Sequence, residues 1–575
     1  MLIPATAPSV SPDQVERRTT KRGFELLLDP VLNKGSAFSL AERRSFALEG
    51  LLPAQVETLE LQVRRSWEAF SALKGAMERY RYVDGLRRSN LVLFHRFLAD
   101  HLEAVLPIVY TPTIGEAIQF FSQNVRTPLL DGVFVCANQR GNLRQILRNG
   151  ITSEVDLVLV TDSEAILGIG DQGVGGIQIC QGKLAVYTLC AGLNPERVLA
   201  VALDVGTNRS SLLADPFYPG LRQRRLEGDA YFSFVDEFVN AVQLECPTAC
   251  LHWEDFGTNH AQKLLDRYRS QLPSFNDDIQ GTSGVASAAV LAACRGLGQS
   301  LADQRIVIFG AGTAGCGIAK GLVRLLQRSG LSSEEARQRI WLIDRPGLLL
   351  QTMAGLTLAA SAFARDPAEV LGWPQDDQGR IDLGSVVELV HPTVLIGTST
   401  VAGAFSRSVV EAMARHCTNP VILPLSNPTS LAEARPADLL AWTEGRALVA
   451  TGSPFEPVQS PEGLRVIGQC NNCFLFPGLG FATVAVGLSA ISDGMIDAGL
   501  EALAQWIPAS HNSNAALMPA LADAAAVGAA VAEAVAMAGV KEGLAPAGVR
   551  ADHVPALLNQ ARWSPGYGPL ECVAV

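Results

Sequence analysis

The chain has 575 residues, 48% of them hydrophobic and 18% charged, which allows large buried cores and excludes the composition of a disordered protein. The formal net charge of −11, without any long run of Lys or Arg, argues against a nucleic-acid partner. The 11 cysteines form no paired framework and the N-terminus lacks a signal-peptide pattern, so we expect reduced thiols and a cytoplasmic location.

The first predicted elements are helices. Between about residues 35 and 105, apolar residues recur at helical spacing and charged residues occupy the opposite positions. Three short apolar runs follow, at 157–162, 197–207 and 249–255, and each one precedes a helix-like segment. This alternation predicts an α/β unit with a mostly parallel sheet, in which ligands lie at the carboxyl ends of the strands.

A second α/β unit is predicted to begin near residue 284. A helix is expected first, and the run "RIVIFGAGTAGCG" then has the pattern of a strand, a glycine turn and a helix. Helices resume after residue 468. The alanine-rich stretch near 519–540 carries Asp523 and Glu533, which favours a packed helix over a membrane span. Further strands are expected at 340–344, 393–400, 421–430 and 447–453.

The glycines of that turn are the first motif that points to chemistry. Gly310, Gly312 and Gly315 have the spacing G-x-G-x-x-G, which allows the backbone to approach a pyrophosphate at the helix N-terminus. A later strand ends in Asp344, whose carboxylate can accept the ribose hydroxyls of NAD and repels the 2′-phosphate of NADP. Arg345 follows directly and leaves NADP open, and a glycine turn of another α/β fold is the alternative without a dinucleotide.

Four carboxylates form the second motif. "HWEDFG" carries Glu254 and Asp255, and "FNDDIQGT" carries Asp277 and Asp278. A lone Glu-Asp pair is usually a strand end that turns to solvent. Carboxylate oxygens on two short segments suit Mg²⁺ or Mn²⁺ instead, and a cation would remove the cost of burying the charges.

The third motif is a lysine in "GKLAVYT". We expect Lys183 at the start of a helix, where the positive helix end and a nearby metal would lower its pKa and let it act as a base. Taken alone, such a lysine is usually a solvated charge, and Tyr110 in "VYTPTIG" has the pattern of an ordinary loop tyrosine.

Together with "VTDSEAILGIGDQG", "PLSNPTS", "TGSPF" and "GQCNNCFLFPGLGF", these motifs occur in the order found in the malic enzyme family, which the chain resembles from about residue 25 to 565. The resemblance implies oxidation and decarboxylation of L-malate to pyruvate with NAD and Mn²⁺ or Mg²⁺, in a homodimer or homotetramer. It implies four parts: a helical N-terminal region at 1–105 with oligomer contacts, a malate- and metal-binding unit at 106–283, a Rossmann-type NAD-binding unit at 284–468, and C-terminal helices with a tail at 469–575.

The resemblance also assigns site residues by position. It implies Tyr110 as the general acid, Lys183 as the general base and Asp277 as their catalytic neighbour. The implied metal ligands are Glu254, Asp255 and Asp278. The residues expected at the cofactor are Gly310, Gly312, Gly315, Asp344, Asn427 and Asp278, and those expected at the substrate are Asn427 and Asn471.

The sequence departs from the family at one substrate position. Ala165 stands where many malic enzymes have an arginine that grips a substrate carboxylate, and malolactic enzymes also have a small residue there. A malolactic enzyme, which releases L-lactate and keeps its NADH bound, is therefore the alternative, although Gln172 replaces the tryptophan typical of that branch. A non-catalytic malate or NAD sensor is disfavoured, because binding alone needs no general acid and base.

Overall fold

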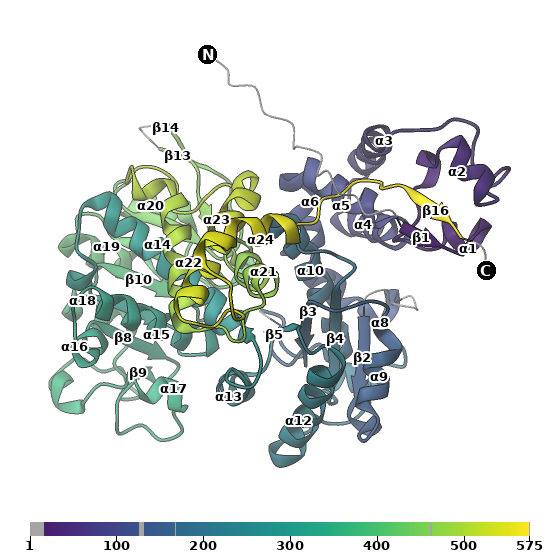
Figure 1. The fold of residues 1–575 in the computed structure, drawn as a ribbon. Helices are drawn as coiled ribbons and strands as arrows, with labels where there is room; N and C mark the ends of the chain where they lie inside the picture. Colours follow the sequence, from purple (N-terminus) through teal and green to yellow (C-terminus); the bar gives the residue numbers. More distant parts are fainter. Residues whose placement is uncertain (1–16, 126–131, 167, 461–462, 574–575) are drawn as a thin grey trace.

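The computed structural model describes residues 17–125, 132–166, 168–460 and 463–573. It contains two largely parallel sheets, and the C-terminal helices lie between the two α/β units that these sheets form (Figure 1). The predicted α/β class is confirmed.

The first unit is built on a parallel sheet with the strand order β2-β4-β3-β5-β6. Its strands are β2 (Gly132–Cys136), β3 (Leu157–Thr161), β4 (Val198–Asp204), β5 (Cys250–Glu254) and β6 (Ser274–Asn276). The connecting helices are α9 (Leu143–Gly150), α10 (Ile177–Ala191), α12 (Gly228–Glu245) and α13 (Thr258–Tyr268). Because all the pairings are parallel, the carboxyl ends of the strands meet at one edge of the sheet.

The second unit has the strand order β15-β12-β11-β10-β7-β8-β9, parallel except for the pairing of β8 with β9. Its strands are β7 (Ile306–Phe309), β8 (Ile340–Asp344), β9 (Gly347–Leu348), β10 (Val394–Gly397), β11 (Val421–Pro424), β12 (Leu448–Thr451) and β15 (Gly468–Gln469). Its main helices are α14 (Thr282–Leu297), α15 (Thr313–Arg328), α16 (Ser333–Gln338), α18 (Leu383–Val390), α19 (Arg407–His416) and α20 (Pro436–Trp442). The chain runs from β7 to β8 and returns to β10 on the other side of β7, which makes β7/β10 the switch point where dinucleotides bind in such sheets.

Both sheets are covered on both faces, which explains why their strands are apolar throughout. In β3, Leu157 and Leu159 face a core shared with α10 and the C-terminal helices, whereas Val158 and Val160 face a second core under α9 and α12. The alternation follows from the two-residue period of a strand. The shared core continues to one face of the second sheet and joins the two units.

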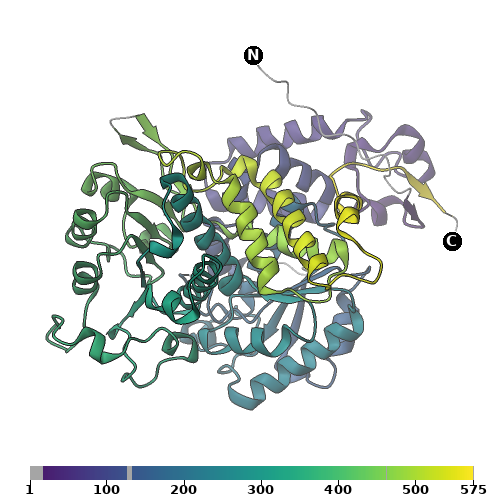
Figure 2. The same ribbon diagram turned by 60° about the vertical axis from the view of Figure 1, so that its left-hand side comes forward.

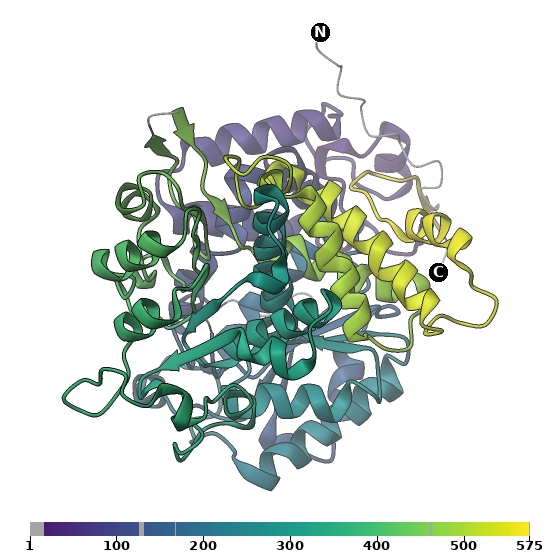
Figure 3. The same ribbon diagram turned by 90° about the vertical axis from the view of Figure 1, so that its left-hand side faces the viewer.

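The C-terminal helices complete this shared core (Figures 2 and 3). They are α21 (Phe476–Val486), α22 (Asp493–Trp506), α23 (Ala524–Lys541) and α24 (Val554–Ala561). Within the described chain, one helical stretch, Leu521–Lys541, is long and apolar enough to cross a membrane. Its residues Val527, Val531 and Val535 are fully buried in the core with α21 and α22, as expected for a packed helix.

The N-terminal region is helical, as predicted. Its helices are α1 (Gly23–Leu27), α2 (Leu40–Ser45), α3 (Leu59–Ala72), α4 (Ala76–Ser89), α5 (Leu91–Asp100), α6 (Leu102–Val109), α7 (Thr113–Gln119) and α8 (Phe121–Asn124). The C-terminal tail crosses back to this region, where β16 (Leu570–Cys572) pairs in parallel with β1 (Arg17–Thr19) (Figure 1). Tyr567 fixes the tail, because its hydroxyl accepts from Asn90 Nδ2 at 2.7 Å and donates to Gln62 Oε1 at 2.7 Å.

Candidate active site

A cleft lies between the two α/β units. Tyr110 and Asp278 line it from the first unit and its neighbouring helices, and Gly312, Thr398 and Asn427 line it from the second. The first-unit side is the strand edge where β5 and β6 end, and the opposite side is the switch point of the second sheet. The cleft therefore brings the two predicted ligand-binding edges face to face.

The glycine turn fits a dinucleotide. A Cβ atom on Gly315 would lie 1.9 Å from the Gly310 carbonyl oxygen, so only glycine permits this close approach of helix and strand. A Cβ atom on Gly312 would meet no atom within 4 Å, which leaves open space above the N-terminus of α15. Asp344 ends β8 and its Oδ2 accepts from the backbone N–H of Ala311 at 3.3 Å, which places the carboxylate beside the turn. This geometry leaves room for a pyrophosphate at the turn and puts a carboxylate nearby, and the roles of these residues in binding NAD stay a prediction.

Two alanine variants test this turn separately. Gly312→Ala should fold normally but put a methyl group where the pyrophosphate approaches, at a cost of about 1–3 kcal/mol, or roughly tenfold to hundredfold weaker NAD binding. Gly315→Ala should lower the melting temperature, because its Cβ collides with backbone. Calorimetric NAD titration and thermal unfolding measure the two effects. Equal NAD affinity of Gly312→Ala and the unmodified protein would contradict this assignment of the turn.

The four predicted carboxylates lie close together, and Asp278 among them lines the first-unit side of the cleft. One oxygen from each of Glu254, Asp255 and Asp278 lies within 4.8 Å of the others, and all three residues are buried. Asp277 is also buried, and Lys183 is the cation that the structure pairs with this group. Four carboxylates against one ammonium leave an excess of negative charge, so the donor set fits a divalent cation with oxygen ligands.

The pKa values reflect this excess. Burial, followed by the repulsion from Glu254, raises the pKa of Asp278 well above its usual range. Burial likewise raises the pKa of Glu254 to about 7, although the Lys183 ammonium partly offsets it. Both shifts show that these carboxylates are costly to ionise in the protein alone. A bound divalent cation would remove that cost.

Lys183 does not lie at a helix start, so that part of the sequence prediction is wrong. It is the seventh residue of α10, and its Nζ lies 2.5 Å from Glu254 Oε2 and 2.5 Å from Asp277 Oδ2. Burial opposes the charged amine, but Asp277 and then Glu254 outweigh it, and the pKa of Lys183 is raised well above its usual value. The lysine therefore carries a positive charge in this structure rather than being poised as a neutral amine.

Gly182 explains why the sequence suggested that α10 starts at Lys183. It lies inside α10, where a Cβ atom would come within 2.7 Å of the Val109 carbonyl oxygen. The glycine lets the end of α6 pack directly on α10, and this contact brings the next residue, Tyr110, to the cleft. Burial raises the pKa of Tyr110 well above its usual value, so its hydroxyl holds its proton at neutral pH.

The two predicted asparagines also line the cleft. Asn427 follows β11, and its Oδ1 accepts from Ser453 Oγ at 2.5 Å. Asn471 begins the short turn after β15, and its Oδ1 accepts from the Cys473 backbone N–H at 3.0 Å. Since both side-chain oxygens are already bonded, each amide can turn its N–H donors toward an anionic ligand.

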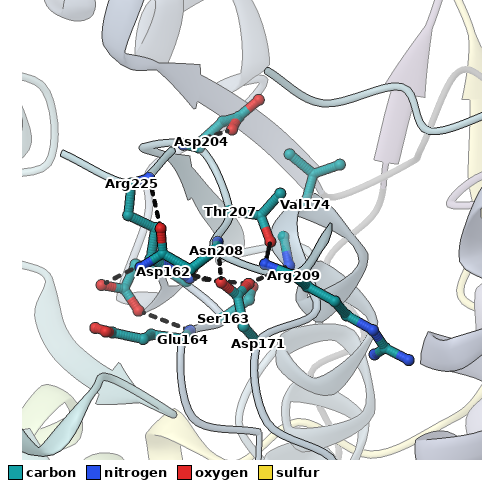
Figure 4. Close-up of polar contacts among 12 residues, drawn as sticks. Asp162, Ser163, Glu164, Asp171, Val174, Asp204, Thr207, Asn208, Arg209 and Arg225 are labelled. Carbon is teal, nitrogen blue, oxygen red and sulfur yellow. Dashed lines mark hydrogen bonds and ion pairs between the residues drawn. The ribbon is translucent and has the colours of Figure 1, made fainter. Parts of the chain in front are cut away.

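Asp162 and Asp204 end strands at the same edge but belong to a different network (Figure 4). Asp162 Oδ2 accepts from the Tyr231 hydroxyl at 2.6 Å, and its backbone oxygen accepts from Arg225 Nη2 at 2.5 Å. Asp204 accepts from the backbone N–H groups of Gly206 at 3.2 Å and Leu221 at 2.7 Å. These contacts fix the loops after β3 and β4, so the strand-end position alone does not identify a ligand-binding carboxylate.

Sequence reasoning missed two polar contacts of the carboxylate cluster. Asn472 donates through Nδ2 to Asp277 Oδ2 at 2.8 Å and to Thr282 Oγ1 at 3.0 Å. His252 Nε2 lies 3.1 Å from Glu254 Oε2. For Asn472 the sequence offered only its position next to the predicted Asn471. For His252 a signal was available, because residues two apart on a strand point to the same face, and His252 precedes Glu254 by two.

Comparison with known proteins agrees with this geometry. The family described as "Malic enzyme, N-terminal domain" matches residues 87–269, and "Malic enzyme, NAD binding domain" matches residues 279–540. The chain belongs to the malic enzyme family. It is 45% identical over 559 residues to the Bacillus subtilis "NAD-dependent malic enzyme 3", covering 97% of this chain and 98% of the relative. It is 44% identical over 510 residues to the Escherichia coli K12 "NAD-dependent malic enzyme", covering 89% and 90%.

Solved malic enzymes share the fold. The Entamoeba histolytica malic enzyme superimposes with a TM-score of 0.55 at 20% identity, covering 90% of this chain and 91% of that chain. The Pyrococcus horikoshii malic enzyme gives a TM-score of 0.52 at 21% identity, covering 80% and 89%. At these identities the likeness concerns the fold alone.

Ala165, where the resemblance led us to expect an arginine, lies at this cleft. Its backbone N–H donates to the Asp255 carbonyl oxygen at 3.1 Å. Among the described residues that line the cleft, none is a lysine or an arginine. Side-chain amides such as those of Asn427 and Asn471 are therefore the donors available in the cleft lining for a second substrate carboxylate.

Proposed function

We propose that this protein catalyses the oxidative decarboxylation of L-malate to pyruvate and CO₂ with reduction of NAD⁺. The observation that carries the proposal is that Asp278, a member of the buried carboxylate cluster with which Lys183 pairs, lines the cleft together with Gly312 of the glycine turn. This arrangement provides for the two demands of the reaction, which are proton removal beside a cation and hydride transfer to a cofactor.

In the proposed site, Glu254, Asp255 and Asp278 hold Mn²⁺ or Mg²⁺. When bound, the cation would supply Lewis acidity at the C2 oxygen of malate, and NAD⁺ would accept the hydride. Gly310, Gly312, Gly315 and Asp344 bind the cofactor, with Asn427 and Asp278 near its nicotinamide end. Asn427 and Asn471 hold the substrate through their amide donors, in a cleft where Ala165 provides no cation.

Lys183 removes the proton from the C2 hydroxyl. A bound divalent cation would neutralise part of the charge of Glu254 and Asp278. These carboxylates would then stabilise the Lys183 ammonium less, and the pKa of Lys183 would fall. Asp277 stays paired with the lysine and can take part in moving the proton, and Asn472 holds that carboxylate in place. Tyr110, which keeps its proton at neutral pH, donates to C3 after CO₂ leaves.

The test uses purified protein with L-malate, Mn²⁺ and NAD⁺, and follows NADH absorbance together with pyruvate and lactate. NADH and pyruvate rising in equal amounts is the expected result. Lactate without net NADH would replace the proposal by a malolactic reaction. Intact NAD binding without any product from malate would mean that Ala165 has moved the specificity away from malate.

We further propose units at 106–283 and 284–468, joined by C-terminal helices at 469–575, and a homodimer or homotetramer in the cytoplasm. The helical region at 1–105 supports the oligomer proposal, because Phe24, Leu28 and Leu40 are large apolar residues that it leaves exposed. Light scattering should give a multiple of the 61.2 kDa chain mass. A monomer at micromolar concentration would contradict an oligomer.

A further inference from the structure

A buried histidine and tyrosine lie directly behind the carboxylate cluster. His252 and Glu254 are two residues apart on β5, so their side chains share one face of the sheet. Lys183 and Tyr187 are four residues apart on α10, so they share one face of the helix. Because α10 packs on this sheet, each member of one pair meets a member of the other.

The contacts form a continuous chain. Tyr187 OH lies 2.8 Å from His252 Nδ1, His252 Nε2 lies 3.1 Å from Glu254 Oε2, and Lys183 Nζ lies 2.5 Å from that same oxygen. An ionised Glu254 can only accept, so Nε2 must carry the ring proton and donate it. Nδ1 then accepts from the tyrosine hydroxyl. Glu254 thus sets the tautomer, and the Tyr187 hydroxyl, by donating to Nδ1, holds the ring in the orientation in which Nε2 reaches Glu254.

The surroundings keep this histidine neutral and in one orientation. His252 is fully buried, with its ring 4.5 Å from the ring centre of Phe275 and 5.6 Å from that of Phe476. Full burial among these aromatic rings disfavours a charged imidazole. A neutral ring adds a hydrogen-bond donor without adding a second positive charge beside the cation site.

We propose that His252, fixed by Tyr187, is a positioning residue that orients Glu254 for the divalent cation. Oε2 of Glu254 accepts from both His252 and Lys183, so ligation falls to the other oxygen of the carboxylate. Without the histidine the carboxylate would keep only the lysine contact and could rotate about its last torsion. This inference rests on the proposed metal role of Glu254, and it adds a residue that touches neither substrate nor cofactor.

The test measures Mn²⁺ affinity of the protein without substrate, by electron paramagnetic resonance of the free ion. His252→Leu removes the donor and should weaken Mn²⁺ binding about 10–100-fold, as lost partners of metal ligands do. His252→Gln keeps an N–H at a similar reach and should restore most of the affinity. Tyr187→Phe keeps the aromatic ring but removes the hydroxyl that donates to His252 Nδ1, so its Mn²⁺ affinity should fall between those of the two His252 variants.

His95→Leu is the matched control, because His95 is a buried histidine on α5 outside the carboxylate cluster. It should change the melting temperature without changing Mn²⁺ affinity. Unchanged Mn²⁺ affinity of His252→Leu, with only a lower melting temperature, would overturn the positioning role. Failure of the unmodified protein to bind Mn²⁺ would instead remove the proposed metal function on which this role depends.

Discussion

Replacing Lys183 by alanine is expected to lower kcat by about 10²- to 10⁴-fold, the usual contribution of a positioned acid–base group. The lysine is buried between Glu254 and Asp277, and the described contacts show no other amine that could take its place. NAD should still bind, because the glycine turn lies on the opposite wall of the cleft. Steady-state kinetics and a calorimetric NAD titration measure the two properties.

The control must separate lost chemistry from lost folding. Lys183→Ala leaves two buried carboxylates without their cation, so its melting temperature will also fall. Adding a small amine such as methylamine should restore part of the turnover, with a rate that rises with pH as the free amine loses its proton. A variant that keeps full turnover, or one that amines never rescue while it remains folded, would remove Lys183 from the role of base.

Replacing Asp278 by asparagine is expected to weaken Mn²⁺ binding by at least about 100-fold. This exceeds the effect of replacing a residue that only hydrogen-bonds to a metal ligand. The amide can still accept the Asp255 backbone N–H, which donates to Asp278 Oδ2 at 2.8 Å, so the turn should survive. What is lost is one negative charge and one strong ligand oxygen. Titration with Mn²⁺ in the absence of substrate measures the change.

Asp278→Asn should weaken Mn²⁺ binding but stabilise the metal-free protein, and this second effect checks the first. Since burial raises the pKa of Asp278, ionising it costs free energy of folding, and this cost grows as pH rises through the ordinary pKa of a carboxyl group. At pH 7 without metal, Asp278→Asn should therefore melt at a higher temperature than the unmodified protein. With Mn²⁺ present, the unmodified protein should have the higher melting temperature, because it binds the cation more tightly.

Asp204→Asn is the control for position, because Asp204 also ends a strand at this edge but contacts loop backbone and the Cys136 thiol rather than the carboxylate cluster. Its Mn²⁺ affinity should equal that of the unmodified protein. If Asp204→Asn and Asp278→Asn weakened binding equally, the strand edge as a whole rather than the carboxylate cluster would be responsible.

The sequence located the ends of β3, β4 and β5 to within three residues, because a buried parallel strand is apolar over its whole length and stops where polar residues begin. The strands predicted at 393–400 and 421–430, in contrast, end earlier, at Gly397 and Pro424. Glu254, Asp162 and Asp204 all lie where expected. The sequence could not distinguish the roles of these carboxylates. Tyr231 and Arg225, which donate hydrogen bonds to Asp162, lie more than 60 residues from it in the chain. The convergence of carboxylates is a property of packing that spacing alone does not contain.

The helix position of Lys183 was missed for a related reason. A glycine before a lysine has the pattern of a helix start, but Gly182 serves the close packing of α6 on α10. Short strands were missed as well. β6 has three residues and β1 three, and neither carries a hydrophobic period long enough to detect.

The pairing of β1 with β16 has a consequence for how the protein is made. A ribosome releases β1 long before β16 exists, so the N-terminal region must wait, with this edge open, until nearly the whole chain has been synthesised. Lys34 Nζ, which donates to the Gly568 carbonyl oxygen at 2.6 Å, is likewise left without that partner until then. The apolar surface that the tail later covers, including Leu26 and Phe38 near Leu570, is exposed during the same interval and is a natural binding site for a chaperone.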